Sequence, residues 1–142
     1  MTPRAAPNGF SWPVRVYWED TDGGGVVYYA NYLKYLERAR SEWLRALGID
    51  QAALAREERI QFAVVEAQMR YRKPAKYDDL LYANARVESY RGASVVFAQE
   101  IRRGAPDGES LLTATIRAAC LDSDTLKPRP LPAALLEELQ RE

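Results

Sequence analysis

The sequence predicts an α+β fold in which an antiparallel sheet of about five strands wraps around one long central helix. Apolar residues recur every three or four positions between residues 29 and 47, which is the spacing of a helix with one buried face. After residue 59 they alternate at every second position, which is the spacing of strands with one buried face. A sheet and a helix that each have one apolar side bury both by packing together.

The long helix is expected over residues 29–47. Its apolar stripe contains Tyr32, Tyr35, Leu36, Ala39, Trp43 and Leu47. Charged residues fill the opposite side, and Gly48 supplies the left-handed residue at which helices commonly end. Asp50 is a suitable N-cap for a second, shorter helix that ends near residue 58.

One strand is expected before the long helix, at residues 14–18, and four strands follow it. The four run over residues 63–72, 81–88, 94–102 and 111–121, with proline and glycine between them. In the first of the four, alternation places Ala63, Val65, Ala67, Met69 and Tyr71 on one face. Three prolines then end the sheet, and a short terminal helix is expected over residues 133–140.

A chain of 142 residues suits a single domain, which we expect over residues 13–142. Residues 1–12 are expected to be a flexible lead-in, because they contain Pro3, Pro7 and the Asn8-Gly9 pair. A single sheet also leaves its edges exposed, and a second subunit is the usual way to cover them. We therefore expect a homodimer or a homotetramer.

The charge and the apolar content of the chain exclude several classes of protein. Lys and Arg total 20, as do Asp and Glu, so the net charge gives no reason to expect a nucleic-acid partner. No apolar stretch reaches the roughly 18 residues that a membrane span requires. The N-terminus lacks the apolar core of a signal peptide, and the single Cys120 cannot form a disulfide within the chain. A cytoplasmic location is expected.

The sequence contains no histidine. Its absence excludes the usual Ser-His-Asp and Cys-His forms of nucleophilic catalysis. It also removes the commonest ligand of zinc and other transition metals, so no metal site is expected. Acid–base chemistry near neutral pH then falls to carboxylates, Lys, Tyr or the one Cys.

The segment between the first strand and the long helix carries the residues best suited to chemistry. Asp20 and Asp22 stand two positions apart at the end of the strand, and three glycines follow them. Glycines let a ligand approach the main chain, and the first N–H groups of the helix lack intrahelical partners. A thioester or an ester needs both groups, a carboxylate at the carbonyl carbon and donors for the developing oxyanion.

Two other kinds of site do not fit this segment. A calcium loop that begins at Asp20 would need a bidentate Glu at its twelfth position, where this chain has Asn31. A phosphate-binding loop would need Gly-Lys-Ser/Thr after the glycines, and Val26 follows them instead. From the local residues alone, a structural turn with one Asp that caps the helix and an active site remain equal alternatives.

Several longer motifs resemble a known family. They are Val16-Tyr17-Trp18-Glu19-Asp20-Thr21-Asp22, Gly25-Val26-Val27-Tyr28, Asn31-Tyr32, Glu37-Arg38-Ala39-Arg40, Tyr71-Arg72-Lys73-Pro74-Ala75 and Leu126-Lys127-Pro128-Arg129. Together they resemble the 4-hydroxybenzoyl-CoA thioesterase branch of the hotdog superfamily, and within it the Tol–Pal-associated (YbgC-like) acyl-CoA thioesterases. The resemblance covers about residues 14–132 and implies a hotdog fold and hydrolysis of acyl-CoA to a free acid and CoA.

The resemblance also implies roles for single residues. Asp22 would act on the thioester carbonyl as a nucleophile or as a general base, and the backbone amide of Tyr29 would donate to the oxyanion. Gly25, Val26 and Tyr28 would contact the substrate. Arg91 and Ser94, in the turn between two strands, match the region where related enzymes hold the CoA nucleotide. No separate cofactor is implied, because CoA is part of the substrate.

The Tol–Pal-type relatives usually carry His where this chain has Tyr29, whereas the hydroxybenzoyl-CoA enzymes carry Tyr there. A non-catalytic module that binds acyl-CoA or acyl carrier protein is therefore kept as the alternative function. By resemblance alone, an acyl carrier protein or Tol–Pal and lipid-synthesis proteins are candidate partners.

Overall fold

The computed structural model describes residues 4–6 and 9–141, and for residues 4–6 and 9 it describes the backbone only. The strands are β1 (Arg4–Ala6), β2 (Gly9–Arg15), β3 (Ile60–Tyr71), β4 (Leu80–Arg91), β5 (Ser94–Arg103) and β6 (Glu109–Asp122). The helices are α1 (Tyr32–Ala46), α2 (Gln51–Ala53) and α3 (Ala133–Gln140), with short turns η1 (Trp18–Asp20), η2 (Tyr29–Asn31) and η3 (Leu54–Glu58).

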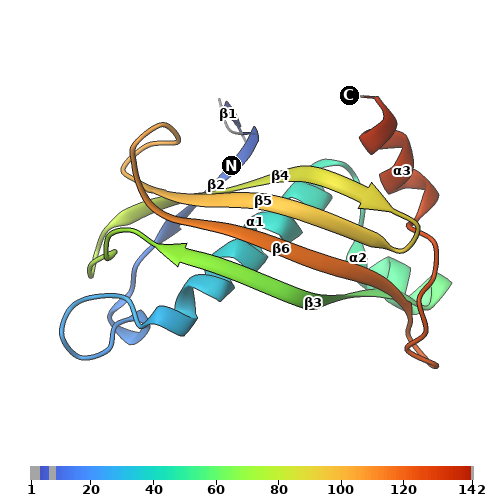
Figure 1. Cartoon of the computed structure of the whole chain (residues 1–142), viewed down its shortest axis with the longest axis horizontal. Helices are drawn as coiled ribbons and strands as arrows, with labels where there is room; N and C mark the ends of the chain where they lie inside the picture. Colours follow the sequence, from blue (N-terminus) through green and yellow to red (C-terminus); the bar gives the residue numbers. More distant parts are fainter. Residues whose placement is uncertain (1–3, 7–8, 142) are drawn as a thin grey trace.

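The six described strands form one antiparallel sheet in the order β1-β2-β4-β5-β6-β3, and α1 crosses one of its faces (Figure 1). The predicted fold class is confirmed. β3 follows α1 in the chain. Among the described strands it pairs only with β6, so it forms one edge of the sheet. The start of α1 lies at the same end of the sheet as the β3–β4 connection, and α3 lies at the other end (Figure 1).

The core lies between α1 and the sheet, as the helical stripe predicts. Tyr35, Leu36 and Ala39 on α1 are fully buried. The sheet residues buried with them include Leu81, Ala83, Ala85, Phe97, Ile101, Leu112 and Ile116. Complementary apolar faces therefore join helix and sheet, which is the dominant stabilising term in a fold of this kind.

The polar side chain of Gln99 is buried within this core. Its amide nitrogen donates to the carbonyls of Leu36 (3.1 Å) and Asn84 (2.8 Å), and its amide oxygen accepts from Arg40 (2.9 Å). The Arg40 guanidinium also lies 5.9 Å from the ring centre of Phe97. Because its hydrogen bonds are made, Gln99 ties α1 to the sheet without the cost of an unsatisfied buried amide.

The ends of α1 differ from each other. Its C-terminus closes as predicted, because Gly48 has a φ of +84° and donates to Arg45 while Ile49 donates to Leu44. At its N-terminus, residues 29–31 form the 3-10 turn η2, so the α-helix begins at Tyr32 rather than at Tyr29. Asp50 caps the short α2 by accepting from Ala53 (3.1 Å).

The predicted alternation along β3 is wrong in its first half. A bulge between Val64 and Glu66 gives β3 one extra residue relative to β6. Val64 is therefore paired with the buried Ala118, whereas Val65, expected on the apolar face, is the extra residue and is 56% exposed. The alternation of apolar and polar residues in the sequence does not reveal a bulge of this kind.

The first long strand begins earlier and ends earlier than predicted. β2 begins at Gly9 and pairs with β4, so residues 10–12 belong to the sheet rather than to a lead-in. β2 stops at Arg15, and residues 18–20 turn into η1. Within the described residues, β1 pairs with β2 only as far as Ser11, so Pro13 lies beyond the described ladder on that side, where a missing N–H is tolerated. Residues 1–3, 7 and 8 of the expected lead-in lie outside the described residues.

In the described part of the chain, no helix combines the length and the apolar character needed to cross a bilayer.

Candidate active site

The glycine-rich loop lies between η1 and η2, at the N-terminal end of α1 (Figure 1). The Asp22 amide donates to the carbonyl of Val26 (3.0 Å), so the loop doubles back on itself. Gly23 and Gly25 have φ values of +91° and +85°, in the region that only glycine occupies without strain. The glycines are therefore required by the shape of the loop.

Asp22 is exposed on this loop. One of its carboxylate oxygens accepts from the Gly24 amide (2.8 Å), which fixes the side chain in a local turn. The other oxygen accepts no hydrogen bond within the described residues. Neither η2 nor α1 has a side-chain N-cap, so Asp22 does not cap the helix. The structural alternative of a capping Asp is thereby excluded.

Asp20 has the opposite environment, since it is buried and its carboxylate accepts from the Tyr17 amide (2.8 Å). Its carbonyl accepts from the Tyr28 amide (2.9 Å) and from the Asn31 side chain (2.9 Å). Burial, and then the nearby Asp20 carboxylate, raise the pKa of the Tyr35 phenol. Asp20 therefore holds the loop to the start of α1, and Asp22 is the carboxylate that remains accessible.

Two backbone amides at the start of α1 have no acceptor. Within the described residues, neither the Tyr29 amide nor the Ala30 amide donates a hydrogen bond, whereas those of Tyr28 and Asn31 do. The first amides of a helix carry partial positive charge and favour a negative group. The hydrogen bond between the Asp22 amide and the Val26 carbonyl places Asp22 beside Val26, which stands three positions before Tyr29 in the chain.

Tyrosine rings surround the same helix start. The ring centres of Tyr28 and Tyr29 lie 4.8 Å apart, and the Tyr71 ring lies 6.5 Å from Tyr29 and 5.5 Å from Tyr32. Contact with the Tyr29 phenol raises the pKa of Tyr28. The Tyr71 hydroxyl donates to the Tyr29 carbonyl (3.0 Å), which joins the end of β3 to η2.

The β3–β4 connection is hydrogen-bonded to the glycine-rich loop. The Val27 amide donates to the Ala75 carbonyl (2.9 Å), and the Tyr77 amide donates to the Gly25 carbonyl (2.9 Å). The Ala75 amide donates to the Tyr32 hydroxyl (3.1 Å), which links the connection to α1. Since these are backbone bonds to a distant segment, the loop shape depends on tertiary structure.

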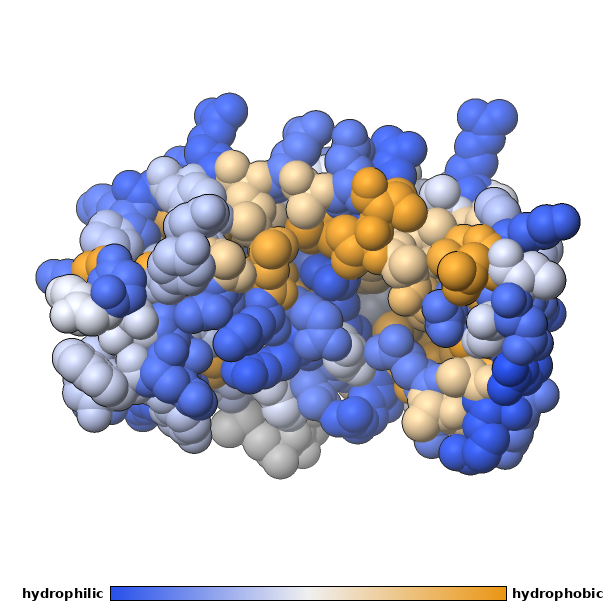
Figure 2. All heavy atoms as spheres, turned by 90° about the horizontal axis from the view of Figure 1, so that it is seen from below, coloured by the Kyte–Doolittle hydropathy of each residue, from blue (hydrophilic) through white to orange (hydrophobic). Residues whose placement is uncertain are grey.

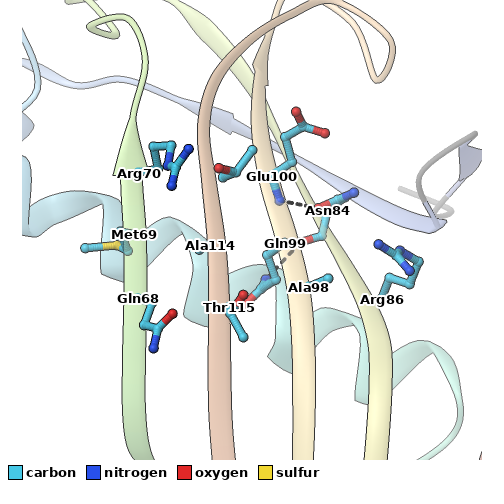
Figure 3. Close-up of a pocket in the computed structure, with 11 residues that line it drawn as sticks. Gln68, Met69, Arg70, Asn84, Arg86, Ala98, Gln99, Glu100, Ala114 and Thr115 are labelled. Carbon is cyan, nitrogen blue, oxygen red and sulfur yellow. Dashed lines mark hydrogen bonds between the residues drawn. The ribbon is translucent and has the colours of Figure 1, made fainter.

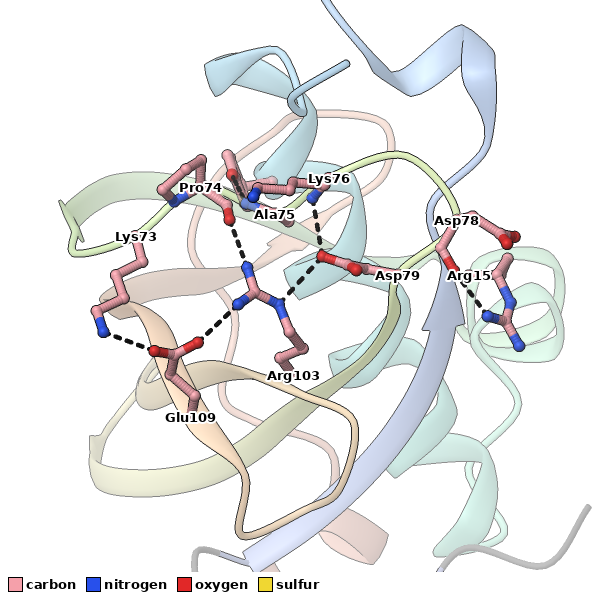
Figure 4. A network of polar contacts seen from close by, with 10 residues as sticks. Arg15, Lys73, Pro74, Ala75, Lys76, Asp78, Asp79, Arg103 and Glu109 are labelled. Atoms are coloured by element: carbon pink, nitrogen blue, oxygen red, sulfur yellow. Dashed lines mark hydrogen bonds and ion pairs between the residues drawn. The ribbon is translucent and has the colours of Figure 1, made fainter.

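A network of charged groups in turn fixes this connection (Figure 4). The Arg103 guanidinium donates to the Pro74 carbonyl (2.6 Å) and pairs with Asp79 (3.1 Å) and Glu109 (2.6 Å). Lys73 also pairs with Glu109 (2.6 Å), and this bond lowers the pKa of the Glu109 carboxyl. Arg103 is not predicted from the sequence as part of this region, because nothing in its local motif points to a contact with residues 74–79.

Only some of the residues predicted to contact the substrate lie near Asp22. Gly25, Val26 and Tyr28 belong to the loop, although the carbonyls of Gly25 and Val26 already accept from Tyr77 and Asp22. Arg91 and Ser94 face each other across the β4–β5 hairpin, at the other end of the sheet (Figure 1). β4 has 12 residues, which separates its two ends by about 36 Å. Within one chain, Arg91 and Ser94 are therefore far from Asp22.

Comparison with known proteins gives the family. The sequence model of the thioesterase-like superfamily matches residues 16–139. The chain belongs to this superfamily. It is similar to the acyl-CoA thioesterase YbgC of Haemophilus influenzae, with 45% identity over 88% of this chain and 90% of that protein. It is also similar to the acyl-CoA thioester hydrolase YbgC of Escherichia coli O6:H1, with 42% identity over 93% of this chain and 96% of that protein.

Solved structures give the same result for the fold of this thioesterase-like chain. A probable thioesterase from Bartonella henselae aligns with a TM-score of 0.79 and 37% identity, over 86% of this chain and 98% of that one. The probable thioesterase YbaW from Escherichia coli aligns with a TM-score of 0.76 and 30% identity, over 92% of this chain and 96% of that one. The predicted hotdog fold is confirmed.

A wide hollow lies elsewhere in the thioesterase-like chain, on the face of the sheet that points away from α1 (Figure 3). Its volume is about 500 Å³, and its lining includes Gln68, Arg70, Arg86, Glu100, Thr113 and Thr115. Glu100 is paired there with Arg102 (2.8 Å). No residue of the Asp22 loop lines this hollow, so we do not place the active site in it.

A smaller hollow of about 140 Å³ lies between α1 and the edge strand β3. Its apolar lining includes Leu44, Phe62, Val64 and Phe97. Figure 2, seen from the side of the β3 edge, shows apolar side chains gathered along this part of the surface. The edge that carries no further strand is thus also an apolar surface.

No group of three or more Asp, Glu or Cys close enough to hold a metal ion occurs among the residues that the structure describes.

Proposed function

We infer that this chain is an enzyme that hydrolyses acyl-CoA thioesters to a carboxylic acid and CoA. The observation that supports this most is that one short loop carries both an accessible carboxylate, Asp22, and amides at the start of α1 that donate no hydrogen bond within the described residues. The family and the named relatives, 42–45% identical over most of the chain, support the same reaction.

In the proposed reaction, the thioester carbonyl lies between Asp22 and the Tyr29 amide. As a general base, Asp22 takes a proton from water while the water oxygen attacks the carbonyl carbon. As a nucleophile, it attacks the carbon itself, CoA leaves, and water then hydrolyses the mixed anhydride. In both routes the carbonyl oxygen becomes an oxyanion, which accepts a hydrogen bond from the Tyr29 amide. The C–S bond then breaks, and the sulfur leaves as a thiolate that is protonated in solvent.

Gly25, Val26 and Tyr28 are proposed to contact the acyl thioester, because they lie between the carboxylate and the amide donor. Neither route requires a metal or a separate cofactor, since carboxylate, water and amide supply every proton and charge. Removal of metal with a chelator is therefore expected to leave the rate unchanged.

We also propose that the enzyme is at least a homodimer, formed along β3. β3 is a 12-residue edge strand beside an apolar hollow, and an edge of this kind is a template for pairing with another strand. A two-fold axis through the middle of β3 reverses one sheet relative to the other. The partner's Arg91 and Ser94 would then lie at the same end of the dimer as Asp22, where they can meet the CoA phosphates.

Thiol release from short-chain, long-chain and aromatic acyl-CoA thioesters tests the reaction. Cys120 is buried, and burial raises the pKa of its thiol, so the native protein should contribute little free thiol to the signal. Release from any of these thioesters is the expected result. Tight calorimetric binding without release would instead identify a non-catalytic module that binds acyl-CoA or acyl carrier protein.

The buried, unpaired Cys120 supports a reducing compartment, and we propose the cytoplasm. An interaction with an acyl carrier protein, or with Tol–Pal and lipid-synthesis proteins, stays a prediction that rests on the resemblance.

A further inference from the structure

Tyr71 is the residue by which the sheet holds the 3-10 turn at the start of α1. Its hydroxyl donates to the Tyr29 carbonyl (3.0 Å). Among the described residues, it is the only side chain that forms a hydrogen bond with the backbone of η2. Tyr71 is the last residue of β3, whereas Tyr29 is the first residue of η2. The bond therefore joins a strand end to a turn that lies 42 positions earlier.

No other side-chain hydrogen bond to the backbone of η2 occurs within the described residues. η2 has three residues and no side-chain cap, and a 3-10 turn has poorer hydrogen-bond geometry than an α-helix. Its internal bond runs from the Asn31 amide to the Tyr28 carbonyl (2.8 Å). The Asn31 side chain adds a bond to the Asp20 carbonyl. Within the described residues, Tyr71 supplies the side-chain hydrogen bond that holds the Tyr29 carbonyl from outside the helix.

Tyr71, in contrast, is itself well anchored. Its backbone pairs with the buried Leu112 on β6, and its ring contacts Tyr32 and Tyr29 edge to face. Burial, and then the neighbouring Tyr32 and Tyr29 phenols, raise the pKa of Tyr71. The phenol therefore keeps its proton at neutral pH and remains a donor.

The bonded carbonyl has a direct relation to the two unbonded amides. It belongs to the peptide unit whose N–H is that of Ala30, and it shares its Cα with the N–H of Tyr29. A hydrogen bond to this carbonyl restricts the orientation of both amides and polarises the Ala30 N–H. Donors that are held in place before the reaction need no reorganisation when the oxyanion forms.

We propose that Tyr71 is a positioning residue, which holds the Tyr29 and Ala30 amides in the orientation that stabilises the oxyanion. The inference rests on the proposed function, because it presupposes thioester hydrolysis with donors at η2. It adds a residue that touches neither the substrate nor the reacting atoms.

The test is Tyr71→Phe, which keeps the ring contacts and removes the hydroxyl. The expected result is a fall in kcat of about 3- to 10-fold, the equivalent of one ordinary hydrogen bond. KM and the affinity for a non-hydrolysable thioether analogue of acyl-CoA should stay within about twofold, since the amides act on the transition state. kcat is expressed per analogue-binding site, so that unfolded protein does not enter the value.

Tyr77→Phe is the matched control. Tyr77 lies beside the same loop, is similarly exposed, and packs edge to face on Trp18 (5.3 Å). Its hydroxyl forms no hydrogen bond in the described part of the molecule, so its removal should leave kcat unchanged.

A wild-type kcat in Tyr71→Phe would overturn the inference, as would a loss of analogue affinity as large as the loss of kcat. If wild type releases no thiol, the proposed function itself fails. If wild type is active and Asp22→Asn is not, while Tyr71→Phe keeps full kcat, only the role of Tyr71 fails.

Discussion

The two ends of the sheet are ordered by different means. At the hairpin end, residues 91–94 turn between two strands that follow each other in the chain, with Gly92 at a φ of +60°. At the loop end, the Asp22 loop is held by residues 71–77, which lie about 50 positions away. The hairpin turn is closed further by long-range bonds, because the carbonyls of Gly92 and Ala93 accept from Leu131 (3.2 Å) and Cys120 (2.8 Å). At the loop end, in contrast, the long-range bonds leave the Asp22 carboxylate and two amides available to a ligand.

Within the loop end, the two carboxylates provide the largest expected effect. Asp22→Asn should lower kcat by about 10³-fold or more, because the amide can neither attack the thioester nor accept a proton from water. Its thermal unfolding midpoint should stay unchanged, since the Asp22 side chain is exposed and, within the described residues, accepts a hydrogen bond only from Gly24. Thiol release and thermal unfolding measure the two quantities.

The buried neighbour should respond in the opposite way. Asp20→Ala leaves the Tyr17 amide without its acceptor and should lower the free energy of unfolding by about 1–3 kcal/mol. Full activity in Asp22→Asn would contradict the assignment of Asp22 as the catalytic carboxylate and Asp20 as the structural one.

Separation of the subunits is the next largest expected effect. Val64→Lys places a charge beside the apolar hollow at the β3 edge, where pairing would bury it. We expect the dimer dissociation constant to rise on the order of 100-fold, because an unpaired buried charge costs several kcal/mol. Analytical ultracentrifugation measures the dissociation constant, and Glu57→Lys, on the exposed η3 turn, is the control. An unaltered dimer would show that the subunits meet through another surface.

Loss of the Arg103 network, which fixes the β3–β4 connection, should have a smaller effect, and that effect is on stability. Arg103→Met removes the bonds to Pro74, Asp79 and Glu109, and we expect the unfolding midpoint to fall by about 5 °C. Arg15 offers a matched control, because it donates one exposed bond to the Asp78 carbonyl (2.7 Å) in the same region (Figure 4). If Arg15→Met and Arg103→Met lower the midpoint equally, the network has no special part in holding residues 73–79.

The smallest effect is expected at the hairpin end. Arg91→Ala should raise KM for acyl-CoA a few-fold and leave kcat unchanged, because one exposed Arg–phosphate contact is weak and screened by salt. The difference from wild type should shrink as ionic strength rises. Steady-state kinetics at two salt concentrations check this, and an unchanged KM at low salt would remove Arg91 from the proposed CoA contacts.

Much of the fold followed from residue patterns. The spacing of three and four along residues 32–43 and the period of two after residue 59 depend on which side of an element is buried, so they predicted the sheet and its central helix. Gly48 predicted the end of α1 for the same local reason. The bulge at Val64 and the early start of β2 were not predicted, because each depends on the partner strand.

The sequence by itself determined that a carboxylate, a run of glycines and a helix start stand together in residues 20–32, and that no histidine is present to assist them. Only the tertiary structure decided that Asp20 is buried and Asp22 exposed, that β3 forms an edge, and that Tyr71 contacts Tyr29. The reason is physical. Periodicity and turn chemistry are set by neighbouring residues, whereas burial, strand order and side-chain contacts arise when distant segments pack together.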